Sequence, residues 1–249
     1  MENIRLSVVV PAYNEGQRIA ATLQVVDAYL KKQAYGYEII VVSDGSRDNT
    51  AAVVEAIKGK IANLKLIANK ENHGKGYVVR QGILEATGQY RLFTDSDNST
   101  PIEQIEKMWP YFDQGFDIVI GSRDAKGAVL DPPQPVYRRF LGEGFGLLTN
   151  IIVGTWGISD TQCGFKAMTA RAAADVLPRC KINRFAFDPE ILAVAKKLKY
   201  RIKEMPVLWK NDLRSTVKFG SMVKMFEDLL VVRMNMIKGI YGKPAKKQQ

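Results

Sequence analysis

The chain has 249 residues, of which 46% are apolar and 25% are charged, and it carries a formal net charge of +10. These values predict one large globular domain with a real core. The two cysteines, Cys163 and Cys180, are too isolated for a metal site and predict a reducing, cytosolic compartment. The chain enters a strand-like run at once, which disfavours a signal peptide, and no apolar run approaches the roughly 18 residues of a membrane span.

The positive charge is unevenly distributed along the chain. From Lys196 onward there are 14 of the 36 lysines and arginines but only 4 of the 26 acidic residues, so this segment carries the whole excess of +10. An anionic partner is therefore expected for the C-terminal part: nucleic acid, acidic lipid or a phosphorylated substrate.

Buried-strand patterns and helical patterns alternate through the first half of the chain. The β-branched run at residues 6–10 is typical of a strand buried on both faces, and further strands are predicted at residues 38–42, 64–68 and 117–120 and at a short apolar run that ends at residue 93. Helical segments follow, for example at residues 18–31 and 77–86. This alternation predicts a doubly wound, mostly parallel central sheet with helices on both faces.

The fourth strand ends in a pair of carboxylates. Asp95-Ser96-Asp97 follows the strand, and Thr100-Pro101 reads as the cap and first residue of a helix. In an open α/β sheet this position is the ligand crevice, and paired carboxylates there suit a hard divalent ion that also holds a diphosphate. The alternative is a polar turn, because Asp, Ser and Asn are common turn residues.

The sequence does not have the residue spacing of two common nucleotide-binding motifs. The turn after the first strand contains no GxGxxG, which excludes the usual dinucleotide fingerprint. Gly74-Lys75-Gly76 opens a helix, but it does not have the GxxxxGK[ST] spacing of a phosphate-binding Walker loop.

Two later segments could meet a membrane. Residues 140–158 are glycine-rich and nearly uncharged, and they predict either a buried helix pair or an amphipathic element on a bilayer; the preceding Arg138-Arg139 favours the second. Residues 221–240 form a basic amphipathic helix, which could bind a bilayer, pack on the sheet, form a homo-oligomer or contact a membrane-embedded partner. Residues 201–207 predict the last strand, and residues 210–220 a polar loop.

Five short motifs occur in an informative order. They are Pro11-Ala12-Tyr13-Asn14-Glu15, Asp44-Gly45-Ser46, Asp95-Ser96-Asp97, Gly121-Ser122-Arg123 and Asp160-Thr161-Gln162-Cys163-Gly164-Phe165-Lys166. Together they resemble family 2 glycosyltransferases of the GT-A fold. The last motif, with Phe185-Ala186-Phe187-Asp188-Pro189-Glu190, is most similar to the dolichyl-phosphate glucosyltransferase branch.

The resemblance implies a GT-A domain over residues 1–220, with an acceptor-side insertion at 136–158 and a basic helix and tail at 221–249. It implies inverting transfer of a hexose, with glucose from UDP-glucose favoured, to a polyprenyl or dolichyl phosphate. The expected partners are the sugar nucleotide, the polyprenyl phosphate and an anionic membrane surface, on a cytoplasmic, peripherally membrane-associated enzyme. The alternative is a transferase that acts on a soluble glycan or alcohol.

Site residues follow from the resemblance position by position. Asp95 and Asp97 would hold Mg²⁺ or Mn²⁺, and the metal would stabilise the departing diphosphate through the Asp-x-Asp (DXD) pair. The nucleotide sugar would contact Pro11, Ala12, Tyr13, Glu15, Val42, Asp44, Lys75, Asp95, Ser96, Asp97, Arg123 and Lys218.

The resemblance implies Asp97 and Asp160 as the catalytic groups, with Asp160 as the candidate base for an acceptor that needs deprotonation, or else a turn residue. Arg138 and Arg139 would bind the acceptor phosphate, or else form a solvated surface pair. Asp188 is predicted to cap a helix, because Pro189 follows it.

The resemblance has departures. The eukaryotic members have an N-terminal membrane anchor that this sequence lacks. Mannosyl-transferring relatives have Gln where this chain has Ser99 and Arg where it has Asp212, a change for which Arg214 could substitute. A nucleic-acid-binding role is disfavoured, because the aromatic residues of the basic segment are few and are not spaced as stacking platforms.

Overall fold

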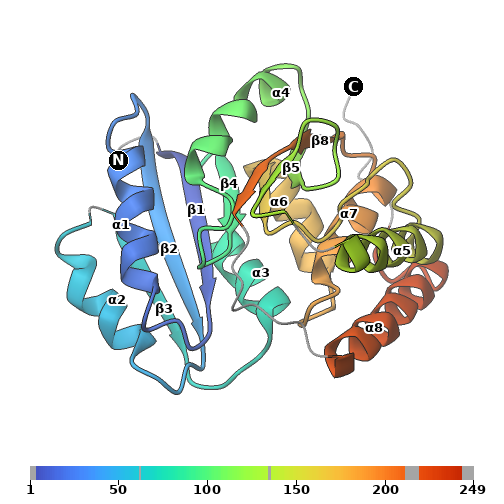
Figure 1. Cartoon of the computed structure of the whole chain (residues 1–249), viewed down its shortest axis with the longest axis horizontal. Coiled ribbons are helices and arrows are strands. Elements are labelled where there is room, and N and C mark those ends of the chain that lie inside the picture. Colours follow the sequence, from blue (N-terminus) through green and yellow to red (C-terminus); the bar gives the residue numbers. More distant parts are fainter. Residues whose placement is uncertain (1–3, 62, 134–135, 211–218, 243–249) are drawn as a thin grey trace.

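The structure is a computed structural model that describes residues 4–61, 63–133, 136–210 and 219–242. A seven-stranded sheet in the order β3-β2-β1-β4-β7-β5-β8 forms its centre (Figure 1). The strands are β1 (Ile4–Ala12), β2 (Gly36–Asp44), β3 (Leu64–Asn69), β4 (Tyr90–Thr94), β5 (Ile118–Ser122), β7 (Phe165–Thr169) and β8 (Ile202–Pro206). All neighbouring pairs are parallel except those that include β7, which confirms the predicted mostly parallel, doubly wound sheet.

Helices cover both faces of this sheet. One core cluster packs beneath α1 (Ile19–Leu30), α2 (Thr50–Lys58), the 3₁₀ helix η1 (Ile102–Lys107) and α4 (Trp109–Asp113). The other lies beneath α3 (Lys75–Glu85), α6 (Ala170–Val176), the 3₁₀ turn η2 (Leu177–Arg179) and α7 (Phe187–Lys197). Residues of β1 alternate between the two clusters, with Val8 and Val10 in one and Val9 in the other, so the strand is buried on both sides.

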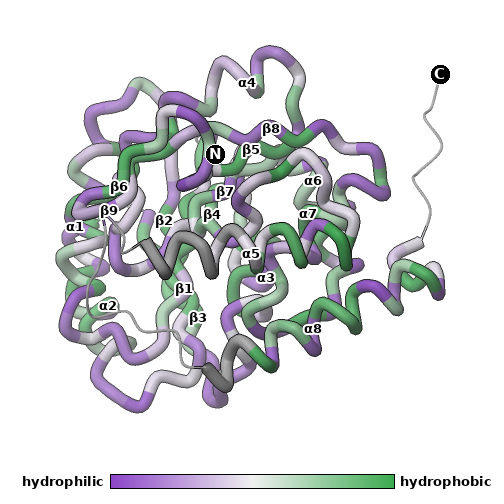
Figure 2. Tube along the Cα trace, turned by 45° about the vertical axis from the view of Figure 1, so that its right-hand side comes forward, coloured by the Kyte–Doolittle hydropathy of each residue, from purple (hydrophilic) through white to green (hydrophobic). Residues whose placement is uncertain are grey.

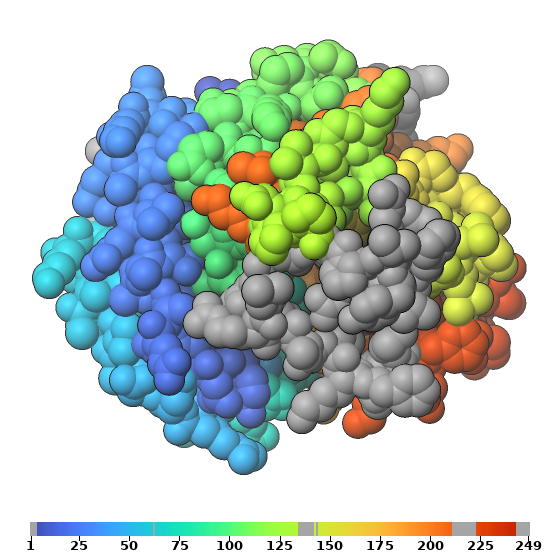
Figure 3. All heavy atoms as spheres, viewed as in Figure 1, coloured from blue at the N-terminus to red at the C-terminus, as the bar shows by residue number. Residues whose placement is uncertain are grey.

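Three strands lie outside the prediction. β7 pairs antiparallel with β4 and β5 in the middle of the sheet, where the sequence predicted only a loop before a helix. β6 (Val129–Asp131) and β9 (Leu208–Lys210) form a separate parallel pair. The orange and lime atoms of this part of the chain meet at the surface in Figure 3.

Two long helices stand at one end of the molecule. The segment 140–158, predicted as a helix pair or an interfacial element, forms the greater part of a single helix, α5 (Val136–Val153), and then residues 154–158 outside any helix; the predicted C-terminal helix is α8 (Phe219–Ile237). They lie side by side in Figures 1 and 2, and both carry green, hydrophobic stretches in Figure 2. Among the described residues, no helix combines the length and the apolar character that a membrane crossing requires.

Two predicted helix caps are wrong in detail. The residue that caps η1 is Pro101 rather than Thr100, and no side chain caps this helix. The residue that caps α7 is Ala186, whereas Asp188 lies inside the first turn of the helix. The side chain of Asp188 is turned toward the sheet, where it pairs with Lys166 of β7, so an interaction between distant elements takes precedence over local capping.

Candidate active site

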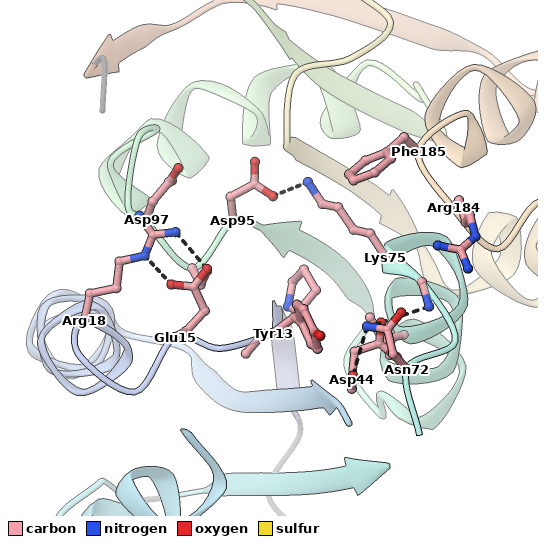
Figure 4. A pocket seen from close by; sticks show the side chains of 15 residues that line it. Tyr13, Glu15, Arg18, Asp44, Asn72, Lys75, Asp95, Asp97, Arg184 and Phe185 are labelled. Carbon is pink, nitrogen blue, oxygen red and sulfur yellow. Dashed lines mark hydrogen bonds and ion pairs between the residues drawn. The ribbon is translucent and has the colours of Figure 1, made fainter. Parts of the chain in front are cut away.

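A cavity of about 500 Å³ opens at the carboxyl ends of the central strands (Figure 4). Its lining residues are Pro11, Ala12, Tyr13, Glu15, Arg18, Asp44, Asn72, Gly74, Lys75, Val78, Asp95, Ser96, Asp97, Arg184 and Phe185. Because β2, β1 and β4 are neighbours and parallel, the motifs that follow them converge on one edge of the sheet. The strand order therefore explains how three separate sequence motifs form one site.

Asp95 is held by a cation and by a glycine. Lys75 Nζ, at the start of α3, lies 2.5 Å from Asp95 Oδ1. The backbone N–H of Asp95 donates to the carbonyl of Gly164, and a Cβ at Gly164 would come within 2.0 Å of Asp95 Oδ2. The glycine in the Cys163-Gly164-Phe165 sequence thus leaves the space that the carboxylate occupies.

Asp97 lies at the left of the cavity in Figure 4, beyond Asp95. Its Oδ1 accepts a hydrogen bond of 2.9 Å from the backbone N–H of Ser99. Burial raises the pKa of the Asp97 carboxyl, and the negative charge of Asp95 adds to this effect. A cation between the two carboxylates would relieve this repulsion. Within the described residues, no cluster of three or more histidine, cysteine or acidic side chains forms a ready-made metal cage.

The loop after β1 is fixed by the loop after β2. Glu15 forms an ion pair with Arg18, and its backbone N–H donates to Thr50 Oγ1 at 2.8 Å. The Tyr13 ring remains 43% exposed, directed at the cavity (Figure 4). The loop therefore presents an aromatic face and a paired carboxylate at fixed positions, as a site for a nucleoside requires.

Asp44 organises the turn that leads into α3. Its Oδ1 accepts from the backbone N–H of His73 at 2.8 Å, and its Oδ2 accepts from the Gly74 N–H at 2.8 Å and from Asn72 Nδ2 at 2.9 Å. Gly74 has φ of +102°, a conformation that favours glycine. Asp44 therefore lines the cavity as predicted, and in addition it fixes the position from which Lys75 reaches Asp95.

A second carboxylate–lysine pair lies behind the cavity wall. Lys166 of β7 is fully buried, and its Nζ lies 2.6 Å from Asp188 Oδ1 of α7. Burial raises the pKa of Asp188 to about 6, although Lys166 and Lys75 oppose the shift. Burial lowers the pKa of Lys75, but the charges of Asp95 and Asp188 outweigh burial, so that the net shift is upward and the ammonium stays charged.

Nine of the twelve predicted nucleotide-sugar residues line this cavity. Of the three exceptions, Val42 is buried in the core with α3, Arg123 does not line the cavity, and Lys218 lies outside the described residues. Asp212 and Arg214 and the side chains of Arg138 and Arg139 also lie outside the description. The roles assigned to these residues stay predictions.

Asp160 and Arg123 bind each other instead of facing the cavity. Arg123 Nε and Nη2 lie 2.7 and 2.9 Å from the two oxygens of Asp160, and the guanidinium stacks 4.9 Å above the Trp209 ring. Burial raises the pKa of Asp160, but Arg123 outweighs it and lowers the pKa to about 2. A carboxylate with this pKa is a weak base, so these contacts favour a structural role, and the catalytic role of Asp160 stays a prediction.

The sequence did not indicate three side chains at the cavity rim: Arg18, Arg184 and Phe185. Arg18 lies in the first turn before α1, and Arg184 and Phe185 lie in the loop before α7, far along the chain from the other site residues. Only Phe185 could have been found from the sequence, because it begins the Phe185–Glu190 motif that resembles the dolichyl-phosphate glucosyltransferase branch. No role was predicted for this residue.

Comparisons with known proteins agree with this geometry. The sequence model described as "Glycosyl transferase family 2" matches residues 7–177. A dolichyl-phosphate beta-glucosyltransferase of Trichomonas vaginalis is 38% identical over 244 residues, which cover 94% of this chain and 72% of that protein. The enzyme of that name from Homo sapiens is 34% identical over 254 residues, which cover 95% and 77% of the two chains. The chain belongs to glycosyl transferase family 2. It is a hexosyltransferase.

Solved structures confirm that this family 2 transferase has the GT-A fold. Mannosyl-3-phosphoglycerate synthase from Rubrobacter xylanophilus superposes with a TM-score of 0.69 at 16% identity and covers 99% of this chain and 78% of its own. Glucosyl-3-phosphoglycerate synthase from Mycobacterium tuberculosis, in complex with Mn²⁺, UDP and glucosyl-3-phosphoglycerate, also superposes with a TM-score of 0.69, at 15% identity, and covers 98% and 82%.

Proposed function

We propose that this enzyme transfers a glucosyl group from UDP-glucose, with inversion, to a dolichyl or other polyprenyl phosphate at a membrane surface. The observation that carries the proposal is the cavity at the strand ends, lined by the acidic pair Asp95 and Asp97, in a chain that is 34–38% identical to proteins named dolichyl-phosphate beta-glucosyltransferase. The nucleoside would lie against Tyr13 and the loop after β1, and the diphosphate would face Asp95 and Asp97.

The residues present fit a divalent metal. Asp95 and Asp97 offer carboxylate oxygens, the donors that Mg²⁺ and Mn²⁺ prefer, and one or two carboxylates suffice when a diphosphate supplies the other ligands. The missing Cβ of Gly164 keeps Asp95 in this position. When bound, the metal would neutralise the charge that develops on the leaving diphosphate. The Mn²⁺ and UDP in the M. tuberculosis structure support this assignment.

The chain's own groups would serve the chemistry by position and charge. An oxygen of the acceptor phosphate forms a bond to the sugar C1 while the bond from C1 to the diphosphate oxygen breaks, and the electron pair leaves with the nucleoside diphosphate. A phosphate acceptor is already ionised near neutral pH, so the reaction needs no strong general base. The low pKa of Asp160 is compatible with such a reaction. Lys75 would supply a fixed positive charge beside the diphosphate.

The membrane contact is proposed for an apolar surface formed by α5 and α8. The α8 positions are spaced three or four residues apart and so share one stripe, and inward-facing residues such as Leu229 and Val232 pack on the core. The exposed apolar residues of the surface are Leu147, Leu148, Ile151, Val223, Phe226, Leu230, Met234 and Ile237. Exposed Lys224 and Arg233 on α8 and Lys238 directly after it could contact anionic lipid headgroups, although Glu227 and Asp228 balance the two charges within the helix.

A transfer assay tests the proposed reaction. The full chain is incubated with a panel of nucleotide sugars and a polyprenyl phosphate, with and without EDTA, and the products are identified by mass. We expect glucosyl transfer from UDP-glucose that EDTA and Asp97→Ala both abolish and that Asp113→Ala, which removes an exposed carboxylate at the end of α4, leaves intact. Transfer that persists in Asp97→Ala would count against the metal site, and transfer only to soluble glycans or alcohols would replace the proposed acceptor.

A sedimentation assay tests the membrane contact separately. Leu230→Glu and Ile237→Glu should reduce co-sedimentation with anionic vesicles, because each places a charge on the apolar stripe. Val25→Glu is the matched control, because Val25 is exposed on α1, outside this surface. Equal vesicle binding by all three variants would show that the stripe does not contact lipid.

A further inference from the structure

One cation of the active-site cavity has no direct partner among the described residues. Three basic side chains line the cavity: Arg18 pairs with Glu15, and Lys75 pairs with Asp95. Arg184 makes no hydrogen bond or ion pair with any residue that the structure describes, and it lies at the end of the cavity away from Asp97 (Figure 4). An exposed guanidinium in a concave site is suited to an anionic ligand.

The loop that carries Arg184 is held in place from two sides. Arg80 of α3 donates to Asn183 Oδ1 at 2.6 Å, and the backbone N–H of Tyr77 donates to the Asn183 carbonyl at 3.1 Å. On the other side, the two oxygens of buried Glu190 accept from the N–H groups of Lys181 and Ile182, both at 2.8 Å. The loop is therefore braced before a ligand arrives, so that little ordering is needed on binding.

The helix that follows this loop, α7, contacts the segment that follows α8. Tyr241, which follows α8, donates its hydroxyl to Glu190 Oε1 at 2.7 Å. Burial raises the pKa of Asp228 on α8, and the positive charge of Arg184 opposes that rise, which places the guanidinium within electrostatic reach of the helix. Arg184 thus lines the cavity and lies near the helix that bears the exposed apolar stripe.

We propose that Arg184 binds the phosphate of the acceptor and that the adjacent Phe185 contacts the first apolar segment of its chain. This inference rests on the proposed function. Asp97 lies at the other end of the cavity and Asp95 between the two ends, where they would serve the donor diphosphate, so an acceptor phosphate needs a separate cation. Phe185 is 51% exposed beside Arg184, so that a charged group and an apolar ring stand side by side. A prenyl phosphate has the same arrangement, a charged head followed directly by hydrocarbon.

Kinetics with matched variants test this proposal. Arg184→Gln removes the charge, Arg184→Lys keeps the charge but not the planar fork, and Lys181→Gln removes an exposed charge from the same loop outside the cavity. Each is assayed with a long polyprenyl phosphate in vesicles, with soluble farnesyl phosphate and with 3-phosphoglycerate. UDP affinity is measured by calorimetry.

We expect Arg184→Gln to raise the KM for both prenyl phosphates about 10- to 100-fold, with UDP affinity changed less than about twofold. Arg184→Lys should recover part of the loss, and Lys181→Gln should match the wild type. Phe185→Ala should raise the KM for prenyl phosphates only. If 3-phosphoglycerate is also an acceptor, an equal rise in its KM assigns Arg184 to the phosphate group whatever its source.

Two results would overturn the Arg184 assignment alone: an unchanged acceptor KM in Arg184→Gln while the wild type transfers sugar, or an equally large loss of UDP affinity, which would place the donor there. Failure of the wild-type enzyme to transfer sugar to any phosphate acceptor would instead overturn the proposed function, and the acceptor site with it.

Discussion

Replacement of Gly164 by alanine tests how much the position of the Asp95 carboxylate contributes to metal binding and sugar transfer. A Cβ at Gly164 would lie 2.0 Å from Asp95 Oδ2 and 2.4 Å from its Cγ, whereas real Cβ contacts are essentially never shorter than 3.0 Å. The carboxylate must therefore move by at least 1.0 Å. The φ of Gly164 does not lie in the left-handed region, so the backbone can accept alanine. The new methyl group would instead clash with the Asp95 side chain.

The size of the effect follows from this displacement. A misplacement of about 1 Å can lower catalysis about 100-fold, so we expect kcat/KM for transfer to fall by about that factor. Overpacking should lower the free energy of unfolding by about 1–3 kcal/mol, which leaves the variant folded. Mn²⁺ binding in the presence of UDP, followed by electron paramagnetic resonance, should weaken in parallel.

Gly59→Ala is the matched control, because Gly59 is exposed directly after α2 and no atom lies within 4 Å of the position that a Cβ would occupy there. It should retain wild-type activity and metal binding. A folded Gly164→Ala enzyme with unchanged Mn²⁺ affinity and unchanged kcat/KM would refute the reasoning that this glycine positions a metal-binding carboxylate.

Three further predictions concern charged and polar contacts. Asp160→Asn should lower the free energy of unfolding at pH 7. Because the pKa of Asp160 in the folded protein, about 2, lies below its ordinary value of 3.8, the wild type should lose about 2 kcal/mol of stability as the pH falls from about 4 to 2. Acid denaturation should show a smaller loss of stability over this pH range in the variant. Tyr241→Phe leaves buried Glu190 short of one donor, so urea denaturation should show a loss of about 1–3 kcal/mol. Lys75→Gln should weaken UDP binding about 10-fold by calorimetry, whereas unchanged affinity would place the ammonium away from the diphosphate.

Sequence patterns predicted the parallel part of the sheet because most of its strands contain a short apolar run between turn residues, such as residues 8–10 of β1 and 118–120 of β5. They missed β7, whose sequence places Lys166 at the second position of the strand. A lysine disfavours a buried strand unless its charge is compensated, and the compensating Asp188 comes from a helix 22 residues later. The pairing of these two residues is a property of the assembled fold, so local patterns could not reveal the strand.

The same distinction applies to the site. Residues directly after β1, β2 and β4 were predicted because parallel strands deliver their carboxyl ends to one edge. Arg184 reaches the cavity from a loop whose position depends on the contact between Asn183 and the turn at Gly74. A Cβ at Gly74 would lie 2.4 Å from the Asn183 carbonyl oxygen, so a single glycine permits the approach of two distant segments.

The alternation of charge around the cavity explains why a lysine can stay charged there. The pKa of Lys75 is lowered by burial, yet Asp95 on one side and Asp188 on the other raise it by more. Lys166 in turn balances Asp188, so the positive and negative groups alternate from the strand β7 to the donor side of the cavity. A donor bound in this cavity as proposed would meet Lys75 already ionised and held by α3, so no proton would have to move and no side chain would have to change position. A site organised in this way can stabilise a departing diphosphate with groups that were positioned during folding.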